Sequence, residues 1–122
     1  MTPRQDAILL RVFVGENDRY RGHALYRAIV DAALKAGLAG ATVLQGPTGF
    51  GQGHTIHTEL NVDAPQNLPV VIEIVDEEAR VQSFLSQLDG MIPSGLVTIE
   101  KVRSLRCGRR TGGQEGSAVH GP

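Results

Sequence analysis

Two short segments of this chain would be apolar on both faces if they formed β-strands. Residues 8–14 (Ile-Leu-Leu-Arg-Val-Phe-Val) carry one charge, at Arg11, and residues 70–75 carry one charge, at Glu73. Successive side chains of a strand point to opposite faces, so these runs predict two strands that are buried on most of both faces.

Two longer segments follow the period of a helix. The apolar face of the first predicted helix is formed by Leu25, Ile29, Ala32 and Ala36. Gly37 comes next and is suited to end the helix in the left-handed conformation. The second helix is predicted over 77–89, with Asp76 as its N-cap and Gly90 at its end. Its apolar face is formed by Val81, Phe84, Leu85 and Leu88.

The order of the predicted elements is βαββαβ, because two more strands are predicted at 41–44 and 96–102. This order is typical of an α+β, ferredoxin-like fold, in which a four-stranded antiparallel sheet carries both helices on one face. The second face of the sheet then lacks cover within the chain. We expect it to pack against other subunits, with Arg11 and Glu73 paired there.

Composition indicates one small folded domain. The chain has 122 residues, of which 41% are hydrophobic, and a net charge of −1. The balanced charge argues against a nucleic-acid-binding protein, and the single Cys107 excludes a disulfide within the chain. We expect residues 1–107 to form the domain and the glycine-rich tail, 108–122, to be disordered. No segment reads as a secretory signal or reaches about 18 consecutive apolar residues, which favours a cytoplasmic protein.

A glycine-rich segment over residues 46–55 is the strongest candidate for a binding site. Four glycines at Gly46, Gly49, Gly51 and Gly53 let the backbone approach a ligand closely, and successive N–H groups bind anions. The lysine of a Walker A loop is replaced by Gln52, and a strand follows where a dinucleotide-binding unit has a helix. A flexible hairpin loop without a ligand is the competing interpretation. The polar stretch at 15–22 is also predicted as a loop.

The same residues resemble the PII-like superfamily of signalling proteins. Gly49-Phe50-Gly51 followed by Gly53-His54 resembles the base of the PII T-loop, and residues 100–108 resemble the last PII strand. Residues 10–16 and 68–76 are most similar to the PII-like branch designated domain-of-unknown-function family 190. The resemblance covers residues 8–107.

The resemblance implies a homotrimer that binds an adenine nucleotide in clefts between subunits and does not catalyse a reaction. By position, Gly49, Phe50 and Gly51 would contact the base and ribose. Backbone N–H groups at Gly90 and Met91 would contact the ligand. The phosphate would meet Arg106, with Arg103 as a second candidate. No cofactor is expected. Ligand binding would order the loop and so control a partner such as a membrane transporter or channel.

Two departures from the PII pattern bear on the ligand. Met91 stands where PII proteins have a lysine that serves the phosphates, and Ser104 replaces another basic residue. The reduced positive charge favours a nucleotide with fewer phosphates than ATP, or another small anion.

Three alternatives remain open from the sequence. His57 and Glu59 share a face if their segment is extended, so a trimer could bind a divalent metal, as in the copper-tolerance proteins of the same superfamily. A small enzyme would use His23, His54 or His57 as its general base, although the sequence shows no recognisable catalytic motif. An assembly protein would have no ligand at all.

Overall fold

A computed structural model describes residues 5–61 and 63–108. The main elements are β1 (Gln5–Gly15), α1 (Leu25–Lys35), β4 (Thr42–Gln45), β7 (Pro69–Asp76), α2 (Glu78–Asp89) and β8 (Leu96–Ser104). Four shorter strands, β2 (Arg19–Tyr20), β3 (His23–Ala24), β5 (Thr48–Gly49) and β6 (His57–Thr58), form two small hairpins. The prediction for the tail at 108–122 lies outside the described residues, apart from Gly108, and stays a prediction.

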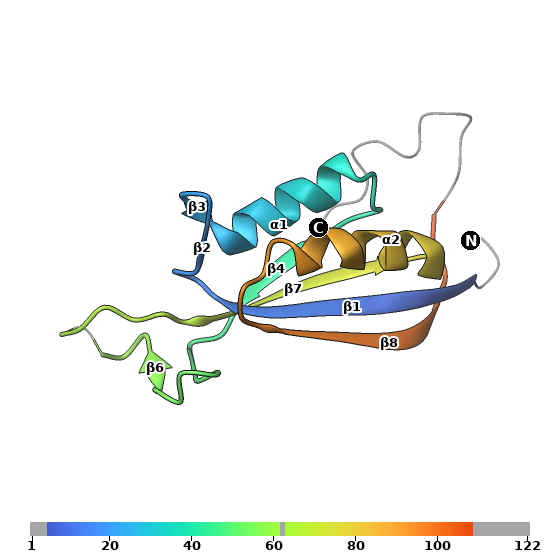
Figure 1. Cartoon of the computed structure of the whole chain (residues 1–122). Coiled ribbons are helices and arrows are strands. Elements are labelled where there is room, and N and C mark those ends of the chain that lie inside the picture. Colours follow the sequence, from blue (N-terminus) through green and yellow to red (C-terminus); the bar gives the residue numbers. More distant parts are fainter. Residues whose placement is uncertain (1–4, 62, 109–122) are drawn as a thin grey trace.

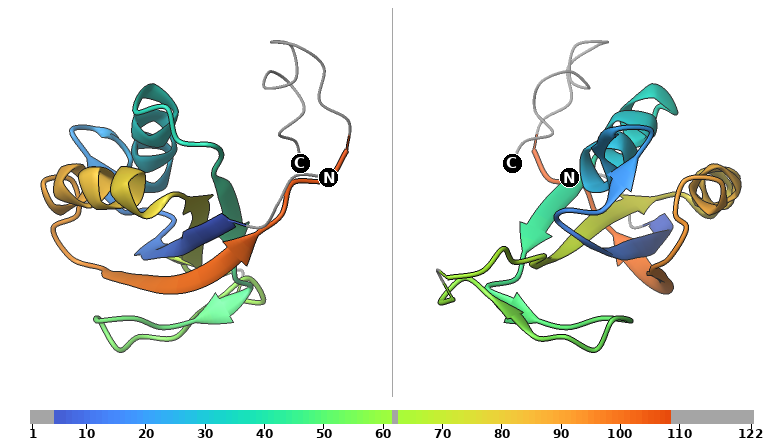
Figure 2. Two further views of the ribbon diagram at one scale, coloured as in Figure 1. Left: turned by 90° about the vertical axis from the view of Figure 1, so that its right-hand side faces the viewer. Right: turned by 60° about the vertical axis from the view of Figure 1, so that its left-hand side comes forward.

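The main sheet has the strand order β4-β7-β1-β8, and all of its pairs are antiparallel. Figure 1 shows both helices above this sheet, and Figure 2 shows that they lie on one side of it while the β5–β6 hairpin lies on the other. The predicted ferredoxin-like α+β fold is confirmed. No helix in the described part of the chain is long and apolar enough to cross a membrane.

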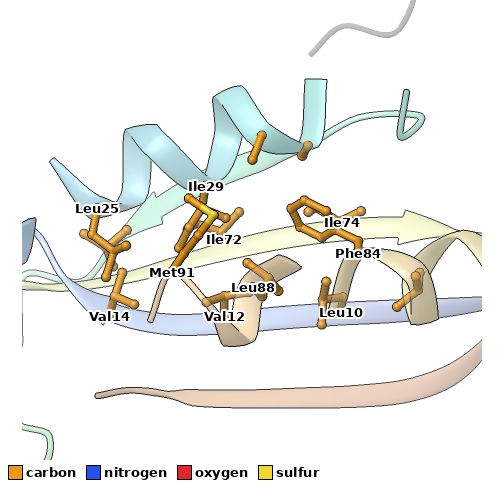
Figure 3. Packing of buried hydrophobic residues seen from close by; sticks show 14 of the residues in the cluster. Leu10, Val12, Val14, Leu25, Ile29, Ile72, Ile74, Phe84, Leu88 and Met91 are labelled. Atoms are coloured by element: carbon orange, nitrogen blue, oxygen red, sulfur yellow. The ribbon is translucent and has the colours of Figure 1, made fainter. Parts of the chain in front are cut away.

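The hydrophobic core lies between the helices and one face of the sheet. On β1 and β7, Leu10 is opposite Ile74 and Val12 is opposite Ile72, and all four side chains are at most 1% exposed. Phe84 of α2 packs over them (Figure 3). The alternating positions that the sequence marks as apolar therefore form this core on one side of the sheet.

The other side of the sheet, called here the open face, is uncovered over much of its area in the single chain. Its apolar residues include Leu9 and Phe13 of β1, Leu44 of β4, Val71 and Val75 of β7, and Leu96 of β8. Leu44, Val75 and Leu96 are 42–58% exposed. Large apolar side chains on an exposed sheet face indicate a surface that binds a partner.

A charged cluster lies in the middle of the open face. The Nε of Arg11 donates a hydrogen bond of 2.9 Å to Oε2 of Glu73, and its Nη1 donates one of 3.3 Å to Oε1 of Glu100. The predicted pair of Arg11 and Glu73 is confirmed. The hydrogen bond to Glu73 raises the pKa of Arg11 above its ordinary value, so the guanidinium stays charged.

The N-cap predicted at Asp76 is wrong. Glu77 occupies that position, and no side chain caps the helix. The Asp76 carboxylate instead accepts hydrogen bonds from the N–H of Ala39, at 2.9 Å, and of Glu77, at 2.7 Å. Asp76 therefore attaches the connection between α1 and β4 to the end of β7.

The segment at 15–22, predicted as a loop, contains β2, which pairs with β3. The turn between these strands has positive φ at Arg21 (50°) and Gly22 (83°), the geometry of a two-residue hairpin turn. The face shared by His57 and Glu59 depends on an extended segment, and among the described residues 54–61 only His57–Thr58 form a strand. Both hairpins depend on local turns, which apolar periodicity does not reveal.

Candidate functional site

A pocket of about 620 Å³ lies at one end of the sheet between the open face and the glycine-rich segment. The hairpin of β5 and β6 projects beneath this end of the sheet (Figure 1). Two walls come from the ends of β1 and β8, and the third comes from residues 49–53. The pocket therefore joins segments that are distant in the sequence.

Its apolar wall includes two aromatic side chains, Phe13 and Phe50. Phe13 and Leu96 line the pocket from the open face, and Phe50 lines it from the loop. Phe50 is 63% exposed, and its ring centroid is 6.2 Å from that of His54. Flat apolar surfaces around a cleft suit a flat ring system, which they bury by stacking.

The glycine-rich segment is held closely against Pro69 at the start of β7. A Cβ at Gly46 or at Gly49 would lie 3.0 Å from Cγ of Pro69, so a side chain at either position would have to displace the proline ring slightly. The N–H of Gly46 also donates a hydrogen bond of 2.8 Å to the carbonyl of Pro69. Gln52 of the same segment accepts a hydrogen bond from the hydroxyl of Ser94, which also lines the pocket.

A group of polar residues is called here the polar corner: Asp18, His57, Gln66 and Asn67. Asp18, His57 and Asn67 line the pocket, and Oε1 of Gln66 lies 3.1 Å from Nδ1 of His57. Asp18 accepts hydrogen bonds from the N–H of Gly15, at 2.8 Å, and from Nδ2 of Asn67, at 3.2 Å. The N–H of Asn17 donates to Oδ1 of Asn67 at 2.7 Å. The polar corner thus connects the turn after β1 to the segment before β7.

Gly15 makes room for the polar corner. A Cβ there would lie 2.4 Å from Nδ2 of Asn67, closer than any real contact, although the φ of Gly15 needs no glycine. Gly15, Asp18 and Asn67 were not among the site residues predicted from the sequence. The only signal was a glycine and an acidic residue after a buried strand, which is common at strand ends.

The predicted loop residues Gly49, Phe50 and Gly51 all line the pocket. Gly90 and Met91 do not. The Met91 side chain is 7% exposed and packs in the core (Figure 3). The N–H groups of Gly90 and Met91 donate hydrogen bonds to the carbonyls of Gln87 and Leu88, so they are used within the chain.

The connection between α2 and β8 does reach the pocket, through other residues. Ser94 and Gly95 line it, three to five positions after the predicted Gly90 and Met91. Within one chain, this connection therefore contributes Ser94 and Gly95 to the pocket, and the ligand contact predicted for Gly90 and Met91 stays a prediction.

The arginines lie at the other end of β8. Leu96 is at the pocket end, and Arg103 is seven residues further along, about 23 Å for an extended strand. Arg106 lies near Asp76 and Arg80 in a separate shallow pocket. Within one chain, neither arginine shares the pocket with Gly49, Phe50 and Gly51.

The described residues contain no cluster of three or more His, Cys, Asp or Glu side chains that could hold a metal ion. Nδ1 of His57 lies 3.1 Å from Oε1 of Gln66 and 3.2 Å from the backbone nitrogen of Asn67. One nitrogen of the candidate metal ligand His57 is thus occupied within the chain.

Comparison with known proteins agrees with this fold. The model of the family DUF190, described as Uncharacterized ACR, matches residues 7–104. A UPF0166 protein of Aquifex aeolicus (strain VF5) is 36% identical over 94 residues, which cover 77% of this chain and 89% of the relative.

Solved structures share the fold at low identity. CPII of Thiomonas intermedia K12, a nitrogen regulatory PII-like protein bound to ADP, AMP and bicarbonate, has a TM-score of 0.62 at 15% identity and covers 84% of this chain and 99% of its own. A protein of Thermus thermophilus described as a putative PII-like signaling protein has a TM-score of 0.63 at 15% identity, with 85% and 94% covered.

A third structure represents the metal-tolerance proteins. The divalent ion tolerance protein CutA1 of Ehrlichia chaffeensis has a TM-score of 0.53 at 14% identity, and 84% of each chain is covered. At these identities the structures establish only the fold, whereas the family model and the Aquifex relative cover most of the sequence. The chain therefore belongs to the DUF190 family, and its fold is that of the PII-like proteins.

Proposed function

We propose that this protein is a PII-like regulator that binds an adenine nucleotide in clefts between the subunits of a homotrimer. The observation that carries the proposal is the pocket between the open face and residues 49–53. Its aromatic wall suits a nucleobase, and its loop is the segment that a bound ligand would order. The ADP and AMP bound to the Thiomonas protein of the same fold support this ligand class.

The charges around the pocket support a site shared between subunits. None of the described residues that line it is a lysine or an arginine. Phosphate groups are normally bound by cationic side chains together with backbone N–H groups. Arg103 and Arg106, at the far end of β8, would provide these cations from a neighbouring subunit. The uncovered open face gives such a neighbour a surface on which to pack.

The ligand acts on a partner through the loop. A nucleotide held between Phe13 and Phe50 would replace the contact between Gln52 and Ser94, and would change the surface that the loop presents. The partner is a membrane transporter or channel, and the protein acts in the cytoplasm without catalysing a reaction.

Isothermal titration calorimetry against AMP, ADP and ATP tests the proposal, together with sedimentation of the free protein. We expect a trimer, and binding that is weakened at least tenfold in Phe50→Ala and in Arg106→Ala. Arg27→Ala is the control, because its side chain is 72% exposed on α1 and Arg27 lines neither the pocket nor the groove that contains Arg106. A monomeric protein, or the absence of heat with all three nucleotides, would refute the proposal.

Divalent-metal binding is the alternative function. Its support is the free side of the His57 ring, of which a trimer would offer three copies. Titration with Cu²⁺, Ni²⁺ and Zn²⁺ in the same calorimeter examines it. Metal binding that disappears in His57→Ala, without any nucleotide binding, would favour the metal-binding protein.

A further inference from the structure

The side chain of His57 has an environment that determines which of its nitrogens carries the proton. Nδ1 lies 3.2 Å from the backbone nitrogen of Asn67, which is a donor, and 3.1 Å from Oε1 of Gln66, which is an acceptor. A single ring nitrogen cannot satisfy both partners, because it either carries a proton or offers a lone pair. One of the two contacts must therefore dominate.

Which contact dominates depends on the other hydrogen bonds that Gln66 and Asn67 can form. Oε1 of Gln66 already accepts a hydrogen bond of 3.1 Å from the N–H of Thr58, whereas no other described acceptor bonds the N–H of Asn67. A part-buried N–H without an acceptor costs more than an acceptor that forms one bond in place of two. Nδ1 of His57 therefore accepts from Asn67, which leaves the proton of the neutral ring on Nε2.

The second nitrogen is free to bind a ligand. Nε2 of His57 makes no hydrogen bond with any residue among 5–61 and 63–108. The residue is only partly exposed and lines the pocket together with Asp18 and Asn67, and Phe13 and Phe50 also line it. An N–H donor without a partner in a largely apolar pocket is a recognition group for an acceptor atom.

We infer that His57 is a ligand-contacting residue of the pocket, whose Nε2–H donates a hydrogen bond to an acceptor atom of the bound nucleoside, a ring nitrogen or a ribose oxygen. The inference rests on the proposed function. Asn67 is then a positioning residue, because its backbone N–H holds the proton on Nε2. Oε1 of Gln66 then accepts only from the N–H of Thr58.

Two variants separate the contact with the ligand from the contact with Asn67. His57→Asn keeps an acceptor near the position of Nδ1 and removes the donor near Nε2. His57→Gln has a longer side chain, so it places an amide N–H near Nε2 and gives up the acceptor near Nδ1. The measurement is the Kd of AMP and of adenosine by calorimetry, with the melting temperature of each free variant.

We expect His57→Asn to keep the melting temperature within about 2 °C and to weaken both ligands about five- to tenfold, the effect of one lost hydrogen bond. His57→Gln should bind within about threefold of the wild type. Equal weakening with AMP and adenosine assigns the contact to the nucleoside. Weakening with AMP alone would overturn that assignment, because the contact would then be to the phosphate.

The same titrations distinguish the failure of this inference from that of the proposed function. If the wild type binds AMP and His57→Asn binds it equally tightly, His57 has only a structural role and the inference alone is wrong. If the wild type binds neither AMP, ADP nor ATP, the proposed function fails and this inference fails with it.

A spectroscopic readout tests the tautomer directly. Long-range ¹H–¹⁵N correlation spectra distinguish protonated from unprotonated ring nitrogens. We expect the Nε2–H tautomer of His57 in the free protein, and a shift of the Nε2 resonance when AMP is added. The Nδ1–H tautomer, or an Nε2 resonance that AMP leaves unchanged, would contradict the inference.

Discussion

The two faces of the sheet differ although they are built from the same strands. Leu10 and Leu9 are neighbours on β1, yet Leu10 is 0% exposed under the helices, whereas Leu9 lies half-buried on the open face. The covered face is entirely apolar along its centre. The open face has apolar side chains around the cluster of Arg11, Glu73 and Glu100.

This difference shows which apolar residues of the strands a single chain buries by itself. A monomer needs only one apolar face on each strand, because one layer of helices covers only one face. Apolar residues on the second face stabilise the protein only when another subunit covers them. The open face therefore offers an apolar surface to a partner, and its end at Phe13 and Leu96 leads into the pocket.

The largest expected effect comes from replacing Leu10 or Leu9 with alanine, which gives one variant for each face of the sheet. Leu10→Ala should lower the free energy of unfolding by about 2–5 kcal/mol, because it leaves a cavity in the core. Leu9→Ala should cost less than half as much in dilute protein, with a larger loss at concentrations where the subunits associate. Urea unfolding at two protein concentrations measures both. Equal losses in dilute protein would mean that the faces do not differ.

Gly15→Ala tests the end of β1, where the open face meets the pocket. The new Cβ would overlap the amide of Asn67, so the polar corner must shift, at a cost of about 1–3 kcal/mol in the free energy of unfolding. Thermal unfolding measures it against Gly40→Ala, since a Cβ at Gly40 meets no atom within 4 Å. A similar change in both variants would show that the polar corner tolerates displacement.

Leu44→Asp is expected to have the smallest effect on folding and a large effect on assembly. Its side chain is 49% exposed on the open face, so the free energy of unfolding of the monomer should change by only about 0.5 kcal/mol. The charge should separate the subunits, which sedimentation detects. Leu34→Asp is the control, because Leu34 is 76% exposed on α1. Dissociation in both variants would assign the interface to another surface.

Part of the candidate site could be predicted from the sequence. Gly49, Phe50 and Gly51, which the sequence marked as a glycine-rich binding loop, line the pocket, and Gly49 lies close to Pro69. The N–H groups expected at Gly90 and Met91 could not be assigned in the same way. Their use by the carbonyls at the end of α2 depends on how that helix ends.

The polar corner was beyond sequence reasoning for another reason. Asp18, His57 and Asn67 come from three separate segments, and each residue type is common in loops. Only the pairing of β1 with β7, which places Gly15 opposite Pro69, brings these segments together. His57, a candidate metal ligand from the sequence, lines the pocket in the structure, and the donor role there is our inference.

The sequence by itself determined the order of the main elements and the strands that are apolar on both faces. These follow from the periodicity of apolar side chains, which is a local property of the chain. The contact between Arg11 and Glu73 also needs the register of β1 and β7. The tertiary structure alone decided which face the helices cover, where the pocket forms, and that Arg103 and Arg106 lie at the opposite end of β8. Those outcomes depend on contacts between residues far apart in the chain, which no local pattern records.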